Sequence, residues 1–234
     1  MIAVAAAGVC RRYGRRWALA DVSFEVPAGA LVMVTGRNGS GKSTLLRVLA
    51  TAIRPDLGTV RILGHDVRAE RDLVRRKIGL LGHRTHLYEP LTALENLAVV
   101  ARFLGADPGR SALLRQLEEV GLGDRGDDPV QTFSAGMRQR LALASVLLQR
   151  PEVVLLDEPY GHLDAAGFLL VDGLLQRLRA QGATVLMATH LMARGRKLCD
   201  LGLVLDAGRL VFAGAAAQLP VPQGADAMGF AEGA

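Results

Sequence analysis

Residues 31–49 read LVMVTGRNGSGKSTLLRVL, and this stretch decides how the rest of the chain is interpreted. Residues 31–35 are an apolar run of strand length, and residues 45–49 place apolar side chains at helical spacing. Between them, residues 36–43 fill every fixed position of the pattern G-x-x-x-x-G-K-[ST]. A chance match in a chain of this length has odds of about one in a hundred from average residue usage. The stretch therefore predicts a strand, a phosphate-binding loop and a helix.

The residue types in this loop suit the binding of a nucleoside triphosphate. Glycines let the backbone wrap closely, so that consecutive N–H groups and the helix N-terminus face the phosphates. Lys42 can reach the β- and γ-phosphates, and the hydroxyl of Ser43 can bind Mg²⁺. The residues expected to hold the nucleotide here are Gly36, Arg37, Asn38, Gly39, Ser40, Gly41, Lys42, Ser43 and Thr44.

A second motif lies in residues 153–159, which read VVLLDEP. An apolar strand that ends in two acids delivers them to the edge of a parallel sheet where phosphates bind. Asp157 is expected to hold Mg²⁺, and Glu158 to act as general base toward the attacking water. Taken alone, the motif is equally explained by a strand that meets a polar loop.

Outward from these motifs, short Val- and Leu-rich runs alternate with amphipathic stretches, which predicts an α/β fold with a buried sheet. The expected strands are 22–26, 31–35, 59–63, 78–81, 153–157, 184–189, 201–205 and 209–212, with a tight turn at 206–208. The expected helices are 42–53, 93–104, 111–120, 135–149 and 165–180; the apolar stripe of the last, which starts at Phe168, is interpreted as core. The first 30 residues are expected to form a small β layer, and residues 91–150 an inserted helical lobe. We expect residues 1–219 to form one domain and residues 220–234 a flexible tail.

Composition narrows the class of protein. Half of the 234 residues are hydrophobic, which excludes a disordered polymer, and two cysteines exclude a disulfide framework. No apolar run approaches the length of about 18 residues that crosses a bilayer, and residues 1–9 do not have the pattern of a secretion signal. We therefore expect a chain in a reducing cytoplasmic compartment that does not span a membrane by itself. The net charge of +5 is compatible with nucleic acid, but the excess is nearly all arginine, which a GC-rich genome also explains.

Residues 133–140, FSAGMRQR, and the pair Thr189-His190 add a resemblance to this interpretation. The chain resembles the ATP-binding subunit of an ABC transporter, whose signature is usually written LSGGQ. Here Phe133 replaces Leu, Ala135 replaces Gly and Met137 replaces Gln. The order of phosphate loop, helical insertion, signature, acid pair and histidine covers about residues 4–219. The implied fold is a phosphate-loop nucleoside triphosphatase core with an antiparallel β layer and an inserted helical lobe.

The resemblance also implies roles for further residues. Tyr13 matches the aromatic residue that stacks on adenine, with Trp17 as the competing ring. His190 matches the histidine that contacts the γ-phosphate. In this family two subunits face each other head to tail, so Ser134 and Gly136 would contact the ATP held by the other subunit. ATP hydrolysis by Lys42, Glu158 and His190 would then drive a separate polytopic membrane subunit, with this chain peripheral on the cytoplasmic face.

Two departures from the family pattern stand out. Where the family usually has glutamine after the fourth predicted strand, residues 82–85 read GHRT, so the position falls on His83 or Arg84. His162 replaces a small residue in the loop that crosses to the other subunit. Residues 82–88, GHRTHLY, together with residues 91–97 resemble the haem-exporter subunit of c-type cytochrome biogenesis. A drug or lipid exporter, a soluble ATPase that acts on nucleic acid, and a non-hydrolysing nucleotide-binding module remain as alternatives.

Overall fold

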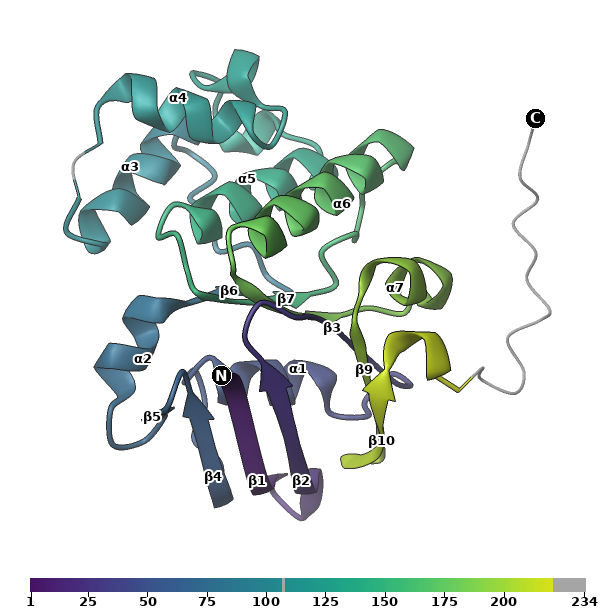
Figure 1. Cartoon of the computed structure of the whole chain (residues 1–234). Helices are drawn as coiled ribbons and strands as arrows, with labels where there is room; N and C mark the ends of the chain where they lie inside the picture. Colours follow the sequence, from purple (N-terminus) through teal and green to yellow (C-terminus); the bar gives the residue numbers. More distant parts are fainter. Residues whose placement is uncertain (107, 221–234) are drawn as a thin grey trace, which may run out of the picture.

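The computed structural model describes residues 1–106 and 108–220, which form two sheets with helices between and above them (Figure 1). The larger sheet has the strand order β10-β9-β3-β8-β7-β6. Its strands are β3 (Leu31–Thr35), β6 (Ile78–Leu81), β7 (Val153–Asp157), β8 (Thr184–Ala188), β9 (Leu201–Asp206) and β10 (Arg209–Ala215). The smaller sheet has the order β2-β1-β4-β5 and consists of β1 (Ile2–Tyr13), β2 (Arg16–Pro27), β4 (Leu57–Ile62) and β5 (His65–Asp66). The expected β layer is confirmed.

The centre of the larger sheet is parallel and fully buried. Every residue of β3, β7 and β8 is buried, and the register pairs Leu31 with Val185 and Val153 with Thr184. Because parallel strands end at the same edge, the residues that follow β3 and β7 emerge at one edge of the sheet, with β8 between the two strands. This edge carries both sequence motifs.

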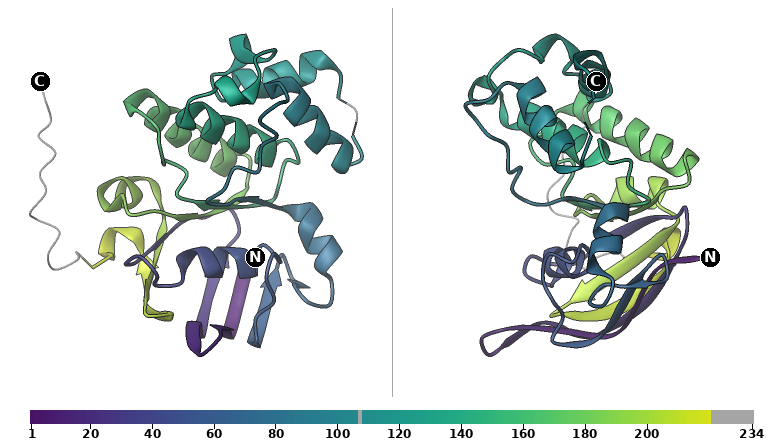
Figure 2. Two further views of the ribbon diagram at one scale, coloured as in Figure 1. Left: turned by 180° about the vertical axis from the view of Figure 1, so that it is seen from behind. Right: turned by 90° about the vertical axis from the view of Figure 1, so that its left-hand side faces the viewer.

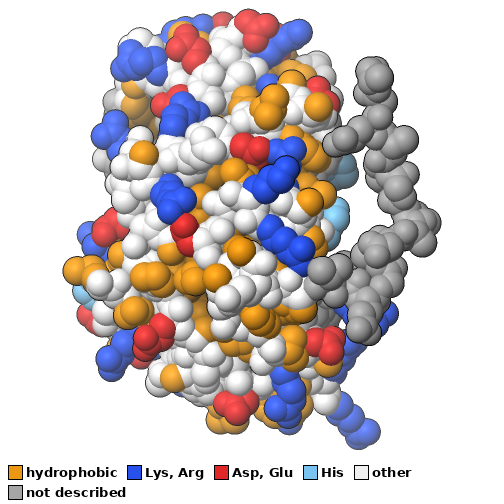
Figure 3. Space-filling view, turned by 45° about the vertical axis from the view of Figure 1, so that its right-hand side comes forward, with side chains coloured by type: hydrophobic (Ala, Val, Ile, Leu, Met, Phe, Trp, Pro, Cys, Tyr) orange, Lys and Arg blue, Asp and Glu red, His pale blue; other side chains and the backbone are white. Residues whose placement is uncertain are grey.

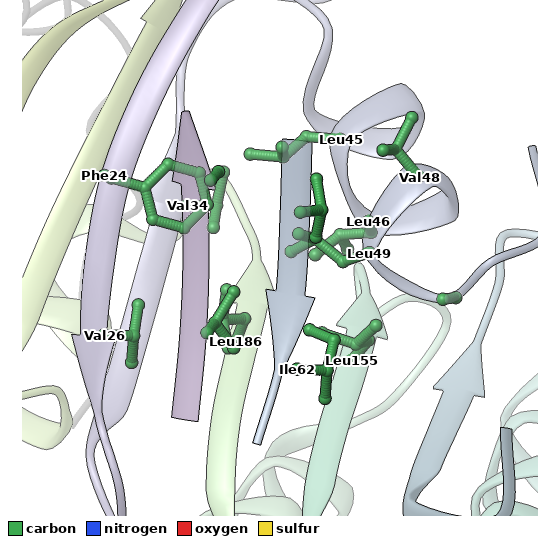
Figure 4. Packing of buried hydrophobic residues seen from close by; sticks show 14 of the residues in the cluster. Phe24, Val26, Val34, Leu45, Leu46, Val48, Leu49, Ile62, Leu155 and Leu186 are labelled. Atoms are coloured by element: carbon green, nitrogen blue, oxygen red, sulfur yellow. The ribbon is translucent and has the colours of Figure 1, made fainter. Parts of the chain in front are cut away.

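Helix α1 (Lys42–Leu49) lies between the two sheets, and its apolar face fills the space between them. Figure 4 shows Leu45, Leu46 and Leu49 packed among side chains from both layers, including Phe24 of β2 and Leu155 of β7. Burial of one such leucine contributes about 1.5–3 kcal/mol relative to leaving it exposed. The helix that follows the phosphate loop is therefore fixed by the core.

The other face of the larger sheet is covered by α5 (Ala135–Leu147), which belongs to the helical lobe, and by α6 (Ala165–Ala180), which follows it in the chain; the other lobe helices lie beyond them (Figure 2). The lobe also contains α3 (Ala93–Phe103), α4 (Arg110–Glu118) and two short 3-10 turns, Gly123–Arg125 and Val130–Thr132. Thr92 and Glu95 form a capping box at the start of α3. No strand is present among the described residues of 91–150, as expected.

Several boundaries differ from the predicted ones. The helix predicted for 42–53 ends at Leu49, because Thr51 takes a left-handed φ of +58°. Helix α2 (Arg71–Lys77) was not predicted, because Val74 is its only buried residue and no apolar stripe marks it. Helix α7 (Met192–Leu198) was missed for a similar reason, since it buries Gly195 rather than a large apolar side chain. The stripe on α6 is core as expected, although Phe168 is only partly buried.

The end of the described chain is tied to the core. Ala216 and Leu219 are buried against Met33 of β3, so the chain stays packed on the core as far as Leu219. Arg196 of α7 donates a hydrogen bond from Nη2 to the carbonyl oxygen of Leu219 at 2.6 Å. The flexible tail predicted for residues 220–234 lies outside the described residues except for Pro220.

None of the helices in residues 1–106 and 108–220 combines the length and the apolar character needed to cross a membrane.

Candidate nucleotide site

The phosphate loop runs from the end of β3 to the start of α1, and its glycines are required by geometry. Gly36 and Gly41 have φ values of +143° and +110°, which side-chain-bearing residues rarely adopt. A Cβ atom at Gly41 would collide with the carbonyl oxygen of Ala18 on β2, and one at Gly36 would collide with that of Leu205 on β9. Both sheets therefore approach the loop too closely for any other residue.

Lys42 lies inside this loop. Its side chain is buried, and Nζ donates hydrogen bonds to the carbonyl oxygens of Gly36 at 2.7 Å and Arg37 at 3.1 Å. The hydroxyl oxygen of Ser40 is also buried and has no hydrogen-bond partner among the described residues. Of these two residues, Lys42 lines the cavity at the loop, so it brings a cation to the place where phosphates would bind.

A cavity of about 290 Å³ opens at this loop and joins the two sequence motifs. Its lining residues are Ala18, Asn38, Gly39, Gly41, Lys42, Ser43, Thr44, His83, Asp157 and Glu158. Asp157 is only 6% exposed and makes no ion pair with a basic side chain in the described part of the chain. A buried carboxylate of this kind needs a cation, and the hard oxygen ligands of Ser43 and Asp157 suit Mg²⁺.

His83 lines this cavity together with Ser43 and Asp157, whereas Arg84 does not. The sequence left the position of the usual glutamine open between these two residues. The structure places His83 at the nucleotide cavity. Both residues line a second, larger cavity of about 810 Å³ between the core and the helical lobe.

Glu158 has an unusual backbone conformation that three hydrogen bonds hold. Its φ is +52°, a left-handed value that is uncommon for glutamate. Its N–H donates to Ala188 at 2.9 Å, and its carbonyl oxygen accepts from Gly161 N–H at 3.0 Å and from Gln139 Nε2 at 3.3 Å. The backbone strain is thereby maintained, as is common for residues that perform chemistry.

The side chain of Glu158 meets His190 directly. Oε2 of Glu158 lies 3.1 Å from Nδ1 of His190, which follows β8. The carboxylate side chain is 29% exposed and the imidazole side chain 77% exposed, so both groups are accessible to solvent. Glu158 lines the phosphate-loop cavity, whereas His190 is not among its lining residues. The expected base and the expected histidine are thus brought together.

Gln139 was not singled out from the sequence. It is buried on α5 and bonds to the backbone of Glu158, so it connects the signature helix to the acid pair. The signal that could have found it is its position inside the 133–140 motif, one turn beyond Ser134 and Gly136.

Ser134 and Gly136 lie at the N-terminus of α5 and are not among the residues that line the phosphate-loop cavity. Ser134 caps the helix, because its Oγ accepts a hydrogen bond from the N–H of Met137 at 3.2 Å. A Cβ atom at Gly136 would lie 2.8 Å from the carbonyl oxygen of His162, whose φ is +62°.

Tyr13 and Trp17 lie at the turn end of the β1–β2 hairpin and are both partly exposed, at 46% and 42%. An arginine covers each ring: Arg11 lies 4.9 Å from the centroid of Tyr13, and Arg12 lies 5.5 Å from that of Trp17. Neither ring lines the phosphate-loop cavity, so the choice of Tyr13 as the adenine-stacking residue stays a prediction.

A parallel sheet with a phosphate loop after one central strand and an acid pair after another defines a phosphate-loop nucleoside triphosphatase. Within that class the family model described as "ABC transporter" matches residues 19–161, and the chain belongs to this family. It is therefore an ATP-binding subunit of an ABC transporter, and an ATPase.

Known relatives match the chain over nearly its whole length. The daunorubicin resistance ATP-binding protein of Streptomyces coeruleorubidus is 40% identical over 226 residues, which cover 96% of this chain and 72% of that protein. A Nod factor export ATP-binding protein of Mesorhizobium japonicum is 35% identical over 91% of this chain and 63% of its own length. A dimeric ATP-binding cassette in a post-hydrolysis state, bound to ADP and Pi, superposes with a TM-score of 0.84 at 28% identity and covers 91% of this chain and 98% of its own. The names of these relatives give no support to the resemblance to a haem exporter.

Proposed function

We propose that this chain hydrolyses ATP to power an exporter, whose cargo is closer to the drugs or Nod factors of its relatives' names than to haem. The observation that supports this most is the 40% identity to a drug-resistance subunit over 96% of the chain. Haem export rests on residues 82–97 alone, and part of that segment is the unusual loop that carries His83.

In the proposed reaction the loop N–H groups and Lys42 bind the phosphates of ATP. Ser43 and Asp157 would hold Mg²⁺, which neutralises charge on the β- and γ-phosphates when bound. Glu158 accepts a proton from the attacking water, and His190, 3.1 Å from its Oε2, orients the carboxylate. The remaining expected loop residues, Gly36 to Thr44, contact the phosphates through their backbone, and Tyr13 stacks on adenine.

The site is proposed to be completed by a second copy of the chain. Ser134 and Gly136 belong to a helix N-terminus that suits a γ-phosphate, yet they do not line the cavity of their own chain. In a head-to-tail dimer they would reach the ATP of the partner, so that ATP holds the two subunits together and hydrolysis releases them. The dimeric form of the similar cassette supports this arrangement.

The membrane partner is proposed to dock in the larger cavity between the core and the lobe. Apolar residues such as Leu46, Leu80 and Val100 line its walls, and Arg47 and Arg84 add positive charge. A polytopic subunit that placed a short segment there would hold this chain at the cytoplasmic face of the membrane. Residues 1–219 would act as one ATP-binding domain, with the lobe of about residues 91–150 as the part that moves with the partner.

The nucleic-acid alternative receives little support from the surface. On the face seen in Figure 3, basic side chains are interspersed with acidic and hydrophobic ones. Several arginines are also paired with carboxylates, for example Arg110 with Asp127 and Arg179 with Asp200. A duplex-binding surface requires clustered, unneutralised charge.

The test is export in vesicles that contain this chain together with a polytopic membrane subunit that co-purifies with it. Daunorubicin is expected to be transported in an ATP-dependent manner and to stimulate hydrolysis, while Lys42→Ala abolishes both. Haem serves as the competing cargo. Transport of haem without transport of the drug would overturn the proposed cargo class, and loss of neither activity in Lys42→Ala would overturn the proposed site.

A further inference from the structure

Four side chains outside the nucleotide cavity form a cluster behind Glu158 and His190. Tyr160 follows β7, Phe168 and Asp172 lie one turn apart on α6, and Arg194 lies on α7. We call this group the Arg194 cluster. None of its members lines the cavity at the phosphate loop.

The contacts within the Arg194 cluster use both oxygens of one carboxylate. The hydroxyl of Tyr160 donates a hydrogen bond to Oδ1 of Asp172 at 2.7 Å, and Nη1 of Arg194 pairs with Oδ2. The guanidinium of Arg194 also lies over the ring of Phe168 at 4.9 Å and over that of Tyr160 at 5.5 Å. The two rings pack edge to face with centroids 5.2 Å apart. Every polar group of the cluster thus has a partner.

The polar groups of the cluster are largely shielded from solvent, so water competes little for their contacts. Tyr160 is 4% exposed, and the side chains of Arg194 and Asp172 are 30% and 18% exposed. Burial, and then the hydrogen bond to Asp172, raise the pKa of Tyr160 well above its ordinary value, so its hydroxyl remains a donor. A shielded ion pair is weak evidence for stability, because apolar residues of similar volume serve a core as well. An orienting role explains its presence better.

Two members of the cluster lie only a few residues along the chain from Glu158 and His190. Tyr160 is two residues beyond Glu158, and the intervening Pro159 has a φ fixed by its ring. Arg194 is four residues beyond His190, whose carbonyl oxygen accepts a hydrogen bond from Met192 N–H at 2.9 Å at the start of α7. Asp172 therefore joins the segment that carries the carboxylate to the segment that carries the imidazole.

We propose that the Arg194 cluster is a positioning device that holds Glu158 and His190 in the geometry required for hydrolysis. Arg194, Asp172 and Tyr160 are positioning residues in this scheme, since none of them touches the reacting atoms. The inference rests on the proposed roles of Glu158 and His190. It predicts that loss of the cluster slows turnover without weakening the binding of ATP.

The test uses the full chain and compares Arg194→Gln, Arg194→Lys and Tyr160→Phe with Arg179→Gln. The control removes another ion pair from α6, between Arg179 and Asp200, that does not belong to the cluster. Because a displacement of about 1 Å can cost about 10²-fold in rate, we expect Arg194→Gln to lower kcat at least tenfold. The KM for ATP and ATP-dependent dimerisation should remain unchanged. Arg194→Lys, which keeps the charge, should recover part of kcat, and Arg179→Gln should retain all of it.

Tyr160→Phe keeps the test decisive if Arg194→Gln does not fold, because it removes a single oxygen atom. A wild-type kcat in Tyr160→Phe and Arg194→Lys, or a change confined to KM, would overturn the proposal. In a His190→Ala background Arg194→Gln should cause little further loss, and fully additive losses would also overturn it.

Failure of the positioning role can be told apart from failure of the proposed function. If Glu158→Gln is inactive while the cluster variants keep the wild-type kcat, only the positioning role is wrong. If Glu158→Gln itself hydrolyses ATP normally, the proposed base is wrong.

Discussion

Replacement of Glu158 by glutamine should trap the protein in its ATP-bound, dimeric form. Glutamine preserves the length of the side chain and the three backbone hydrogen bonds that hold residue 158 beside Ala188, Gly161 and Gln139. It cannot accept the proton of the attacking water. ATP binding depends on Lys42 and the loop amides, which the substitution does not touch.

The expected magnitude follows from the role of a positioned base. Loss of such a base costs about 10²–10⁴ in rate, or about 2.7–5.4 kcal/mol in activation free energy. The free energy of unfolding should change by less than about 0.5 kcal/mol, because the side chain is partly exposed and the backbone is unchanged. Glu158→Gln should therefore slow ATP hydrolysis without changing the stability of the fold.

Glycine at the same position provides a second, opposite readout. A left-handed backbone conformation destabilises a side-chain-bearing residue by about 1–2 kcal/mol, and glycine avoids this cost. Glycine also loses more backbone entropy on folding, which offsets about 0.5–1 kcal/mol of the gain. Glu158→Gly should therefore be more stable than the wild type by about 0.75 kcal/mol, within a range of about 0–1.5 kcal/mol. For a domain of this size the Tm should rise by about 2–3 °C and by no more than about 6 °C. The inactive glycine variant would then be more stable than the active protein.

The assay combines light scattering with MgATP, phosphate release and thermal melting on the same three proteins. With MgATP, Glu158→Gln should have twice the monomer mass by light scattering and should release phosphate at least about 10²-fold more slowly than the wild type. Its Tm should equal that of the wild type. Wild-type phosphate release by Glu158→Gln would refute its role as base. A Tm of Glu158→Gly below that of the wild type would refute the interpretation of φ +52° as strain.

The other predictions concern the remaining parts of the site. Tyr13→Ala should weaken ATP binding about tenfold or more, since stacking on an aromatic ring contributes about 1–3 kcal/mol; titration that shows the loss in Trp17→Ala instead would assign adenine to the other ring. Lys42→Ala should abolish ATP binding, whereas Ser134→Arg should retain binding and stop turnover, and equal loss of nucleotide in both variants would contradict a two-subunit site. Arg84→Gln should keep basal hydrolysis, because Arg84 lines the larger cavity proposed to receive the membrane partner and not the phosphate-loop cavity, but should change stimulation by that partner. Unchanged stimulation in reconstituted complexes would show that Arg84 is not part of the coupling surface.

The fold and the centre of the site were predictable because their signals are local. Residues 31–49 contain a strand, the phosphate loop and a helix in one continuous run, and residues 153–159 contain a strand followed by the acid pair. The structure places the phosphate loop and the acid pair at one edge of the sheet. Helices α2 and α7 could not be found in this way, since each buries only one residue and is held by contacts from distant segments.

Other features depend on the third dimension. The sequence could not separate His83 from Arg84, because only the path of the loop decides which one reaches the cavity at Asp157. Gln139 was likewise missed, since its partner is a backbone carbonyl nineteen residues along the chain. The Arg194 cluster joins three segments that no periodicity relates, and its Phe168 was interpreted as ordinary core.

The hydrogen bond from Arg196 to the carbonyl oxygen of Leu219 connects the last turn of the described chain to α7, so a spectroscopic label in that turn would lie close to the helix. Helix α7 carries Arg196 on the stretch that follows His190, and the last turn of the described chain is bonded to that helix. Gln218 is exposed in this turn and is remote in sequence from every residue proposed to bind ATP. A fluorophore attached to a cysteine at position 218, with Cys10 and Cys199 replaced, would test whether α7 moves during the catalytic cycle without occupying the nucleotide site. Its signal could then be used to time the reopening of the dimer against the release of phosphate.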